Sequence, residues 1–148
     1  MLVRQRQKVQ EVPRGIDPVR EFIRAFNERD LDAFVAVLDP EVELHSGRGL
    51  RKGVQAARVW ATREPGGVQQ TIVLEALYEE GLEGGGGTAV ALIVRRWHWA
   101  EDGTAAGEDE MAWQFELRDR RVRSWRPHQD RAAALRDGGF PNEAGSAG

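Results

Sequence analysis

The spacing of apolar residues predicts two short helices that meet at a polar corner. Asp17 can cap the first turn of the first helix, and Pro18 suits its first helical position. Its apolar stripe, at the i, i+3, i+4, i+7 spacing of an amphipathic helix, consists of Val19, Phe22, Ile23 and Phe26. The second helix is predicted from its cap at Asp30 to Asp39, because the residue before Pro40 avoids the helical region. Its stripe consists of Leu31, Phe34, Val35 and Leu38.

A third helix is predicted beyond a short strand and a loop. The strand covers 42–45 and the loop covers 46–49. The helix runs over 53–63, and Glu-Pro-Gly-Gly at 64–67 ends it. Its apolar residues at helical spacing are Val54, Ala57 and Trp60.

The rest of the chain is predicted to be mainly sheet. Strands are expected over 69–79, 88–99, 110–118 and 122–127, and a helical turn or two over 130–136 ends at Gly138 and Gly139. Between them lie a flexible connection at 80–87, a polar loop at 101–109 and a tight turn at 118–121. Helices segregated before an antiparallel sheet indicate the α+β class.

The strand predicted over 88–99 is apolar on both faces as far as Val94, which is typical of a central strand. Two apolar faces are also more than a sheet wetted on one side needs, so we expect a homodimer. Trp97 and Trp99 are the side chains that such a partner would bury.

Length and composition indicate one soluble domain. The chain has 148 residues, of which 41% are hydrophobic and 30% charged. We expect the domain over 16–140, an N-terminal extension over 1–15 and a flexible tail over 141–148. The apolar run 88–94 is too short to cross a membrane, and no secretory h-region is visible, so a cytoplasmic protein without membrane contact is expected.

Charge and residue types narrow the chemistry further. The net charge of −3 is not that of a nucleic-acid binder. There is no cysteine, which excludes thiolate catalysis and thiolate metal sites. The histidines at 45, 98 and 128 lack zinc-site spacing, so no metal is expected.

Four segments resemble the SnoaL-like branch of the nuclear-transport-factor-two-like superfamily. They are 26–34 (FNERDLDAF), 38–45 (LDPEVELH), 51–53 (RKG, opening a helix) and 121–135 (RVRSWRPHQDRAAAL), the last similar to the ending of bacterial members. The resemblance covers about residues 17–140. It implies a cone-shaped, strongly curved antiparallel sheet, with three N-terminal helices covering an apolar pocket. It also implies homodimers, no metal or organic cofactor, and acid–base side chains inside the pocket.

His45 is the first candidate for catalysis, because similar ketosteroid isomerases place a general base, an aspartate, near this position. An imidazole titrates near neutral pH and can take a proton from beside a carbonyl. Strand alternation, however, places His45 on the face opposite Leu44. If the apolar face points inward, His45 points to solvent or to a neighbouring subunit.

His98 and Glu110 are the candidates for assisting groups. His98 could line the pocket, or it could lie on the sheet face at a dimer interface. Glu110 and Glu116 flank Trp113 on the other face of their strand, where an exposed surface charge is the alternative explanation. Trp113 occupies the position of the isomerases' proton-donating acid, which weakens the case for isomerase chemistry in particular.

The expected ligand is a small, apolar, carbonyl-containing molecule, and the expected chemistry is cyclisation, isomerisation or dehydration without a cofactor. A non-catalytic ligand-binding or dimerisation module is the alternative, since large side chains could also fill the cone. Arginines at 95, 96, 121, 123 and 126 could bind an anion, but acidic neighbours favour a solvated, salt-bridged face. The predicted pocket-lining residues are Phe26, Phe34, Trp60, Met111, Trp113 and Phe115.

Overall fold

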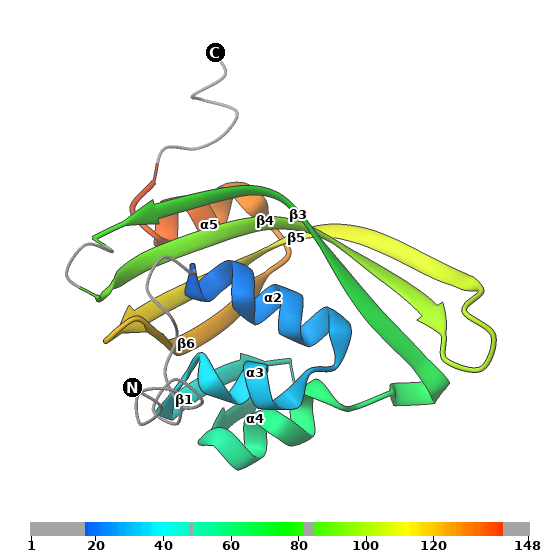
Figure 1. Cartoon of the computed structure of the whole chain (residues 1–148). Helices are drawn as coiled ribbons and strands as arrows, with labels where there is room; N and C mark the ends of the chain where they lie inside the picture. The colour runs from blue at the N-terminus through cyan, green and yellow to red at the C-terminus, as the bar shows by residue number, and fades with distance from the viewer. Residues whose placement is uncertain (1–16, 48, 82–84, 141–148) are drawn as a thin grey trace.

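The computed structural model describes residues 17–47, 49–81 and 85–140, so the predicted extension (1–15) and tail (141–148) lie outside the described residues. Within the described ranges, every helix is too short and too polar to cross a membrane. The elements, shown in Figure 1, are α2 (Pro18–Glu28), α3 (Leu31–Ala36), β1 (Leu38–Ser46), β2 (Gly49–Lys52), α4 (Val54–Ala61), the 3-10 turn η1 (Pro65–Gly67), β3 (Val68–Glu80), β4 (Gly87–Trp99), β5 (Ala105–Arg118), β6 (Arg121–His128) and α5 (Arg131–Asp137).

The helix caps are those that the sequence predicts. The Asp17 carboxylate accepts hydrogen bonds from the backbone N–H groups of Val19 and Arg20, at 2.8 and 3.3 Å. Asp30 caps α3 in the same way, by accepting from the N–H of Ala33 at 3.2 Å. The side-chain amide of Asn27 then joins α2 to β3, because it donates to the carbonyl of Ile72 and accepts from its N–H, both at 2.8 Å.

The predicted end of the second helix is wrong. α3 stops at Ala36, and Leu38 already begins β1, where it pairs with Val122 of β6. Leu38 fits the helical stripe by spacing, but its apolar side chain is buried equally well from a strand. Asp39 lies within the strand and receives two hydrogen bonds from Arg118, both at 2.9 Å.

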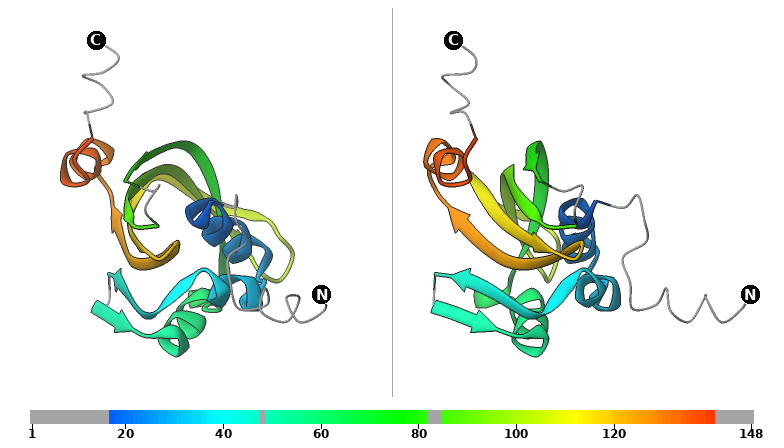
Figure 2. Two further views of the ribbon diagram at one scale, coloured as in Figure 1. Left: turned by 60° about the vertical axis from the view of Figure 1, so that its left-hand side comes forward. Right: turned by 90° about the vertical axis from the view of Figure 1, so that its left-hand side faces the viewer.

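The sheet has six strands in the order β2-β1-β6-β5-β4-β3. All neighbours are antiparallel except β1 and β6, which run parallel. Figure 2 shows the sheet curling around α2, so the predicted α+β cone is confirmed. The short edge strand β2 was not predicted. The predicted loop over 101–109 is also wrong in part, because β5 starts at Ala105 and its polar residues pair with β4.

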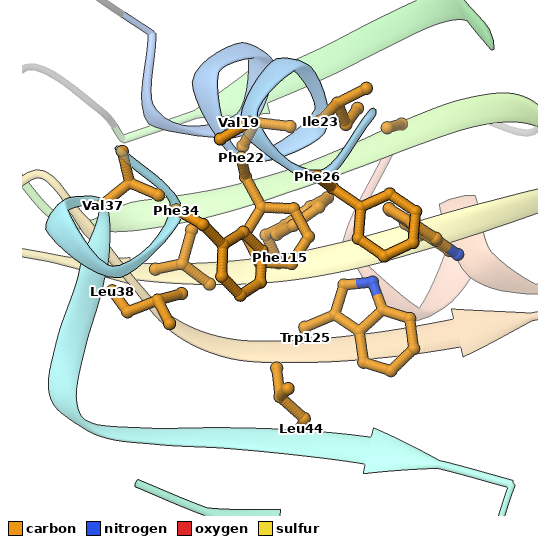
Figure 3. Packing of buried hydrophobic residues seen from close by; sticks show 14 of the residues in the cluster. Val19, Phe22, Ile23, Phe26, Phe34, Val37, Leu38, Leu44, Phe115 and Trp125 are labelled. Carbon is orange, nitrogen blue, oxygen red and sulfur yellow. The ribbon is translucent and has the colours of Figure 1, made fainter. Parts of the chain in front are cut away.

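The concave face of the sheet holds an aromatic core beneath the helices. Figure 3 shows Phe22, Phe26 and Phe34 facing Phe115 and Trp125 of the sheet. The rings of Phe22 and Phe34 lie 4.9 Å apart, and those of Phe22 and Phe115 lie 5.1 Å apart. Such tilted and edge-on ring pairs contribute beyond the area that they bury. The core therefore fixes the helices on the sheet.

The convex face of β4 is covered by the chain's own helix α5. Val90 and Leu92 are fully buried there against Ala134 and Leu135 of that helix. The second apolar face of β4 is thus satisfied within one chain, and it no longer argues for a partner. The homodimer stays a prediction, and Trp99, which is 45% exposed, remains a side chain that a partner could cover.

Candidate functional site

A cavity of about 330 Å³ lies where α4 meets five of the six strands, all except β2. Its walls come from Ser46 at the end of β1, Trp60 of α4, Gln70 of β3 and the inward-facing residues of β4, β5 and β6. This volume is near the lower end of the range of about 300–1,000 Å³ for pockets that hold small organic molecules. The cavity can therefore hold a compact ring system.

Three tryptophans form the apolar walls of this cavity. The ring of Trp125 lies 4.7 Å from that of Trp60 and 5.3 Å from that of Trp113, the latter pair nearly perpendicular. Met111 and Pro127 continue the wall. Pairing between β5 and β6 sets Trp113 opposite Pro127, so neighbouring strands deliver these groups to one place. Rigid rings of this kind offer large contact areas to a flat ligand.

The polar part of the lining consists of donors and neutral groups. Arg95 is held in place by Asp109, whose carboxylate accepts from Nε at 3.1 Å and from Nη2 at 2.9 Å. The Arg95 guanidinium also lies over the Trp97 ring, 4.6 Å from its centroid. The other polar residues of the lining are Ser46, Arg63, Gln70 and Gln129. No carboxylate or imidazole belongs to the lining formed by the described residues.

A second, much smaller cavity of about 20 Å³ adjoins the first and shares Trp60, Arg63 and Gln70 with it. Arg29 also lines this smaller cavity and donates to the carbonyls of Phe26 and Gln70, at 2.5 and 3.0 Å. Burial lowers the pKa of Arg29, and the nearby Glu64 opposes this effect. Arginine remains charged at neutral pH even so, so the smaller cavity is lined by a further cation.

The three predicted catalytic residues lie away from the cavity. His45 is on the face opposite Leu44, with its Nε2 3.7 Å from a carboxylate oxygen of Glu43. Glu110 is exposed on the convex side of β5, and His98 is half-buried on the same side of β4. The structure does not bring the three together, so a catalytic role for any of them stays a prediction.

The predicted pocket residues divide into two groups. Trp60, Met111 and Trp113 line the cavity, and Phe26 lines the small adjoining one. Phe34 and Phe115 are completely buried among the core rings instead. The large side chains thus fill part of the cone and leave part of it open.

Sequence reasoning named Arg95 only within a group of arginines that could bind an anion or form a salt-bridged face. It missed Arg63, Gln70, Trp125 and Asp109. Asp109 had a usable signal, because the alternation that turns Met111 and Trp113 inward reaches back to it once β5 is extended. Arg95 likewise follows the inward-facing Ile93 by two residues. Gln70 carried the same signal, because it precedes the inward-facing Ile72 of β3 by two residues. Arg63 carried none, since only the folding of α4 onto the sheet brings it to the site. Among the described residues, no three acidic, histidine or cysteine side chains gather around a metal-sized space.

Comparisons with known proteins identify the fold. The sequence matches no protein-family model and no curated protein. A protein with a ketosteroid isomerase-like fold from Catenulispora acidiphila, solved with trimethylamine, has a TM-score of 0.63 at 15% identity, with 86% of this chain and 95% of that one covered. An LEH-like epoxide hydrolase from Mycobacterium tuberculosis has a TM-score of 0.62 at 17% identity, covering 82% and 81%.

A third structure carries the name of the superfamily itself. It is an NTF2-like protein of unknown function from Burkholderia pseudomallei, with a TM-score of 0.60 at 23% identity and coverage of 80% of this chain and 92% of that one. Sequence identities this low are evidence of a shared fold and not of a shared chemical activity. The chain has the curved-sheet fold of the nuclear-transport-factor-two-like superfamily, which it shares with ketosteroid isomerase-like proteins.

Proposed function

We propose that this protein binds a small, flat, ring-containing organic molecule in the cavity of about 330 Å³. The observation that carries the proposal is the set of three tryptophan walls, Trp60, Trp113 and Trp125, around a space that the core leaves open. Ligand sites are typically concave and mostly apolar, with a few convergent polar groups. Arg63, Arg95 and the side-chain amides of the lining are groups of that kind.

Binding without a chemical step is the reading that the lining favours. A general base works best with a pKa near the working pH, and the side chains with that property are mainly histidine and perturbed carboxylates. The described lining offers arginines, amides and one hydroxyl instead. The epoxide hydrolase among the similar structures does not change this, because one fold hosts enzymes and binding proteins alike.

Acid–base catalysis is a second candidate, favoured by one observation at the rim. Asp109 stands on the inward-facing side of β5, next to the cavity-lining Arg95 that holds its carboxylate. If a reaction takes place, Asp109 is the group that would accept the proton, and Arg95 would orient it. Asp109→Asn would then abolish turnover while leaving ligand binding in place.

A blocking substitution at the cavity rim tests the binding proposal. Gly47 lines the cavity, and among the described residues no atom outside its two chain neighbours lies within 4 Å of the position where its Cβ would stand. Gly47→Trp is therefore expected to fold and to obstruct the site. The matched control is Leu50→Trp, which places the same side chain on β2 at a residue that is 49% exposed and pairs with His45.

The measurement is a titration with acetylnaphthalene, a flat neutral ketone, and binding is monitored by calorimetry and by intrinsic tryptophan fluorescence. Wild type and Leu50→Trp are expected to bind it, and Gly47→Trp is expected to bind at least 10-fold more weakly, which corresponds to about 1.4 kcal/mol. Equal binding by all three proteins would place the ligand elsewhere. If none of the three proteins binds acetylnaphthalene, the proposal is refuted.

A further inference from the structure

We infer that Arg95 is the residue that selects the ligand, and that it does so by donating hydrogen bonds to a carbonyl oxygen on the ligand's ring system. The inference rests on the proposed binding function and adds to it the chemical class of the ligand, an aromatic carbonyl compound. Its basis is the juxtaposition of a fixed guanidinium group, with N–H groups to spare, and the tryptophan walls of the cavity.

The alternation of side chains along β4 brings Arg95 to the cavity. Arg95 follows the inward-facing Ile93 by two residues, and it stands directly opposite Asp109 in the pairing of β4 with β5. The ion pair between Arg95 and Asp109 therefore closes across two neighbouring strands. Only 21% of the Arg95 side chain is exposed, so the guanidinium group belongs to the wall of the cavity and not to the outer surface.

The contacts of Arg95 leave part of its guanidinium group unused. A guanidinium group carries five N–H donors and no acceptor. Nε gives its single N–H to the Asp109 carboxylate, and Nη2 gives one of its two. Within the described ranges, Nη1 has no hydrogen-bond partner. Three N–H groups therefore remain for a ligand, and their complement is a hydrogen-bond acceptor.

Two neighbours fix the orientation of these donors. The two hydrogen bonds to Asp109 hold one edge of the guanidinium group, and the group lies over the Trp97 ring, 4.6 Å from the ring centroid. A side chain that is already held in place loses little further freedom when a ligand binds. Hydrogen bonds from a charged donor are also stronger than those between neutral groups.

A carbonyl group conjugated to a flat ring suits this arrangement. Its oxygen is an acceptor only, and its lone pairs lie in the plane of the group, at the edge of the ring system. The faces of the same ring system are then free to contact the tryptophan walls, Trp60, Trp113 and Trp125. The ligand is thus held by its faces through apolar contact and by its edge through Arg95.

Two compounds that differ in a single group test the inference. Isopropenylnaphthalene has the ring and nearly the shape of acetylnaphthalene, with a CH2 group in place of the carbonyl oxygen. Calorimetry on the wild-type protein is expected to show acetylnaphthalene binding roughly 10- to 100-fold more tightly, the ratio typical of a hydrogen bond to a charged group. The C=O stretching band of the bound ketone is expected at a lower frequency than in an apolar solvent, because accepting a hydrogen bond weakens the C=O bond.

Substitutions then assign the preference to Arg95. Arg95→Met keeps an unbranched side chain without N–H groups, and the two compounds are expected to bind it with nearly equal affinity. Arg96→Met is the matched control, because Arg96 is exposed on the opposite face of β4 and pairs with Glu108 at 3.3 Å. It is expected to keep the full preference. Arg95→Lys keeps a charge beside Asp109 and replaces Arg95→Met if that variant fails to fold; because lysine lacks the planar fork, the preference is expected to fall several-fold.

The outcomes separate this inference from the binding function. Equal affinity of wild type for the two compounds, with both still excluded by Gly47→Trp, would overturn carbonyl recognition and leave the binding function intact. A preference that persists unchanged in Arg95→Met, or in Arg95→Lys, would belong to another donor and would overturn the role of Arg95. Failure of both compounds to bind wild type would overturn the inference together with the binding function.

Discussion

Replacing Arg120 by glycine is expected to stabilise the protein. β5 and β6 are joined by a two-residue turn, closed by the pair Arg118 and Arg121, as the sequence predicts. Both turn residues have positive φ, 53° at Asp119 and 63° at Arg120. This is the type I′ geometry that favours Asn-Gly or Asp-Gly in hairpins. Arginine at the second position is therefore strained, whereas Asp119 tolerates the conformation.

The magnitude follows from two opposing effects. A left-handed backbone costs a residue with a Cβ about 1–2 kcal/mol. Glycine, in turn, gives the unfolded chain extra freedom, which costs the folded state about 0.5–1 kcal/mol. The backbone N–H of residue 120 keeps its hydrogen bond to the Gly85 carbonyl in either case. We expect a net gain of about 0.5–1 kcal/mol, or a melting temperature higher by roughly 1–4 °C.

Urea unfolding followed by tryptophan fluorescence measures this gain. Arg126→Gly is the control, because it makes the same chemical change in β6, where φ is not positive. That variant is expected to lose about 0.5–1 kcal/mol. A lower midpoint for Arg120→Gly than for wild type would mean that the side-chain contacts of Arg120 outweigh its backbone strain, and would refute the reasoning.

Four further outcomes are expected. Asp39→Asn should lower the free energy of unfolding in urea by about 1–3 kcal/mol, because Asp39 is buried and Arg118 donates two hydrogen bonds to it. Burial by itself would raise the pKa of Asp39, but hydrogen bonds from Arg118 and from the Glu41 N–H lower it overall. The stability that this carboxylate contributes is therefore lost as pH falls. Trp113→Ala should destabilise by about 3–5 kcal/mol and weaken acetylnaphthalene binding, as calorimetry would show. Partial burial, and after it the Asp17 carboxyl, raise the pKa of Glu79 to about 7 from an ordinary 4.5. The folded state therefore binds the Glu79 proton more tightly than the unfolded state, and the free energy of unfolding falls as pH rises between these two values. Glu79→Gln should reduce this pH dependence in unfolding curves taken across the range. Light scattering is expected to report the predicted dimer, and Trp99→Ser should weaken it.

The sequence predicts those parts of the fold whose pattern is local. The caps at Asp17 and Asp30 and the apolar stripe of α2 depend on neighbours within a few residues, so they are recognisable without a structure. The start of β1 is not, because Leu38 fits a helix by spacing and becomes a strand residue only by pairing with the distant Val122. The start of β5 is missed for a different reason. Residues 105–108 (Ala-Ala-Gly-Glu) are all exposed, so burial imposes no alternation of apolar and polar side chains on them.

The candidate site is less predictable than the fold for the same reason. Trp60, Met111 and Trp113 lie on apolar faces that periodicity reveals. Arg63 lies beyond the end of α4, and long-range packing alone makes it a neighbour of Trp125. His45 shows what a family resemblance does not predict. Its place in the sequence is near that of the general base in similar isomerases, but the alternation of side chains along β1 turns it away from the cavity.

The parallel pairing of β1 with β6 has a consequence for how the chain must fold. Arg123 of β6 donates to the carbonyl of Glu41 of β1, a partner 82 residues earlier. While the chain is being synthesised, β1 can therefore pair only with β2. Trp60 cannot pack against the ring of Trp125 until β6 has left the ribosome. Closing so long a loop is slow, and the apolar faces of α2 and α4 stay open meanwhile. Holdase chaperones would meet this protein chiefly in that interval, before its last strand arrives.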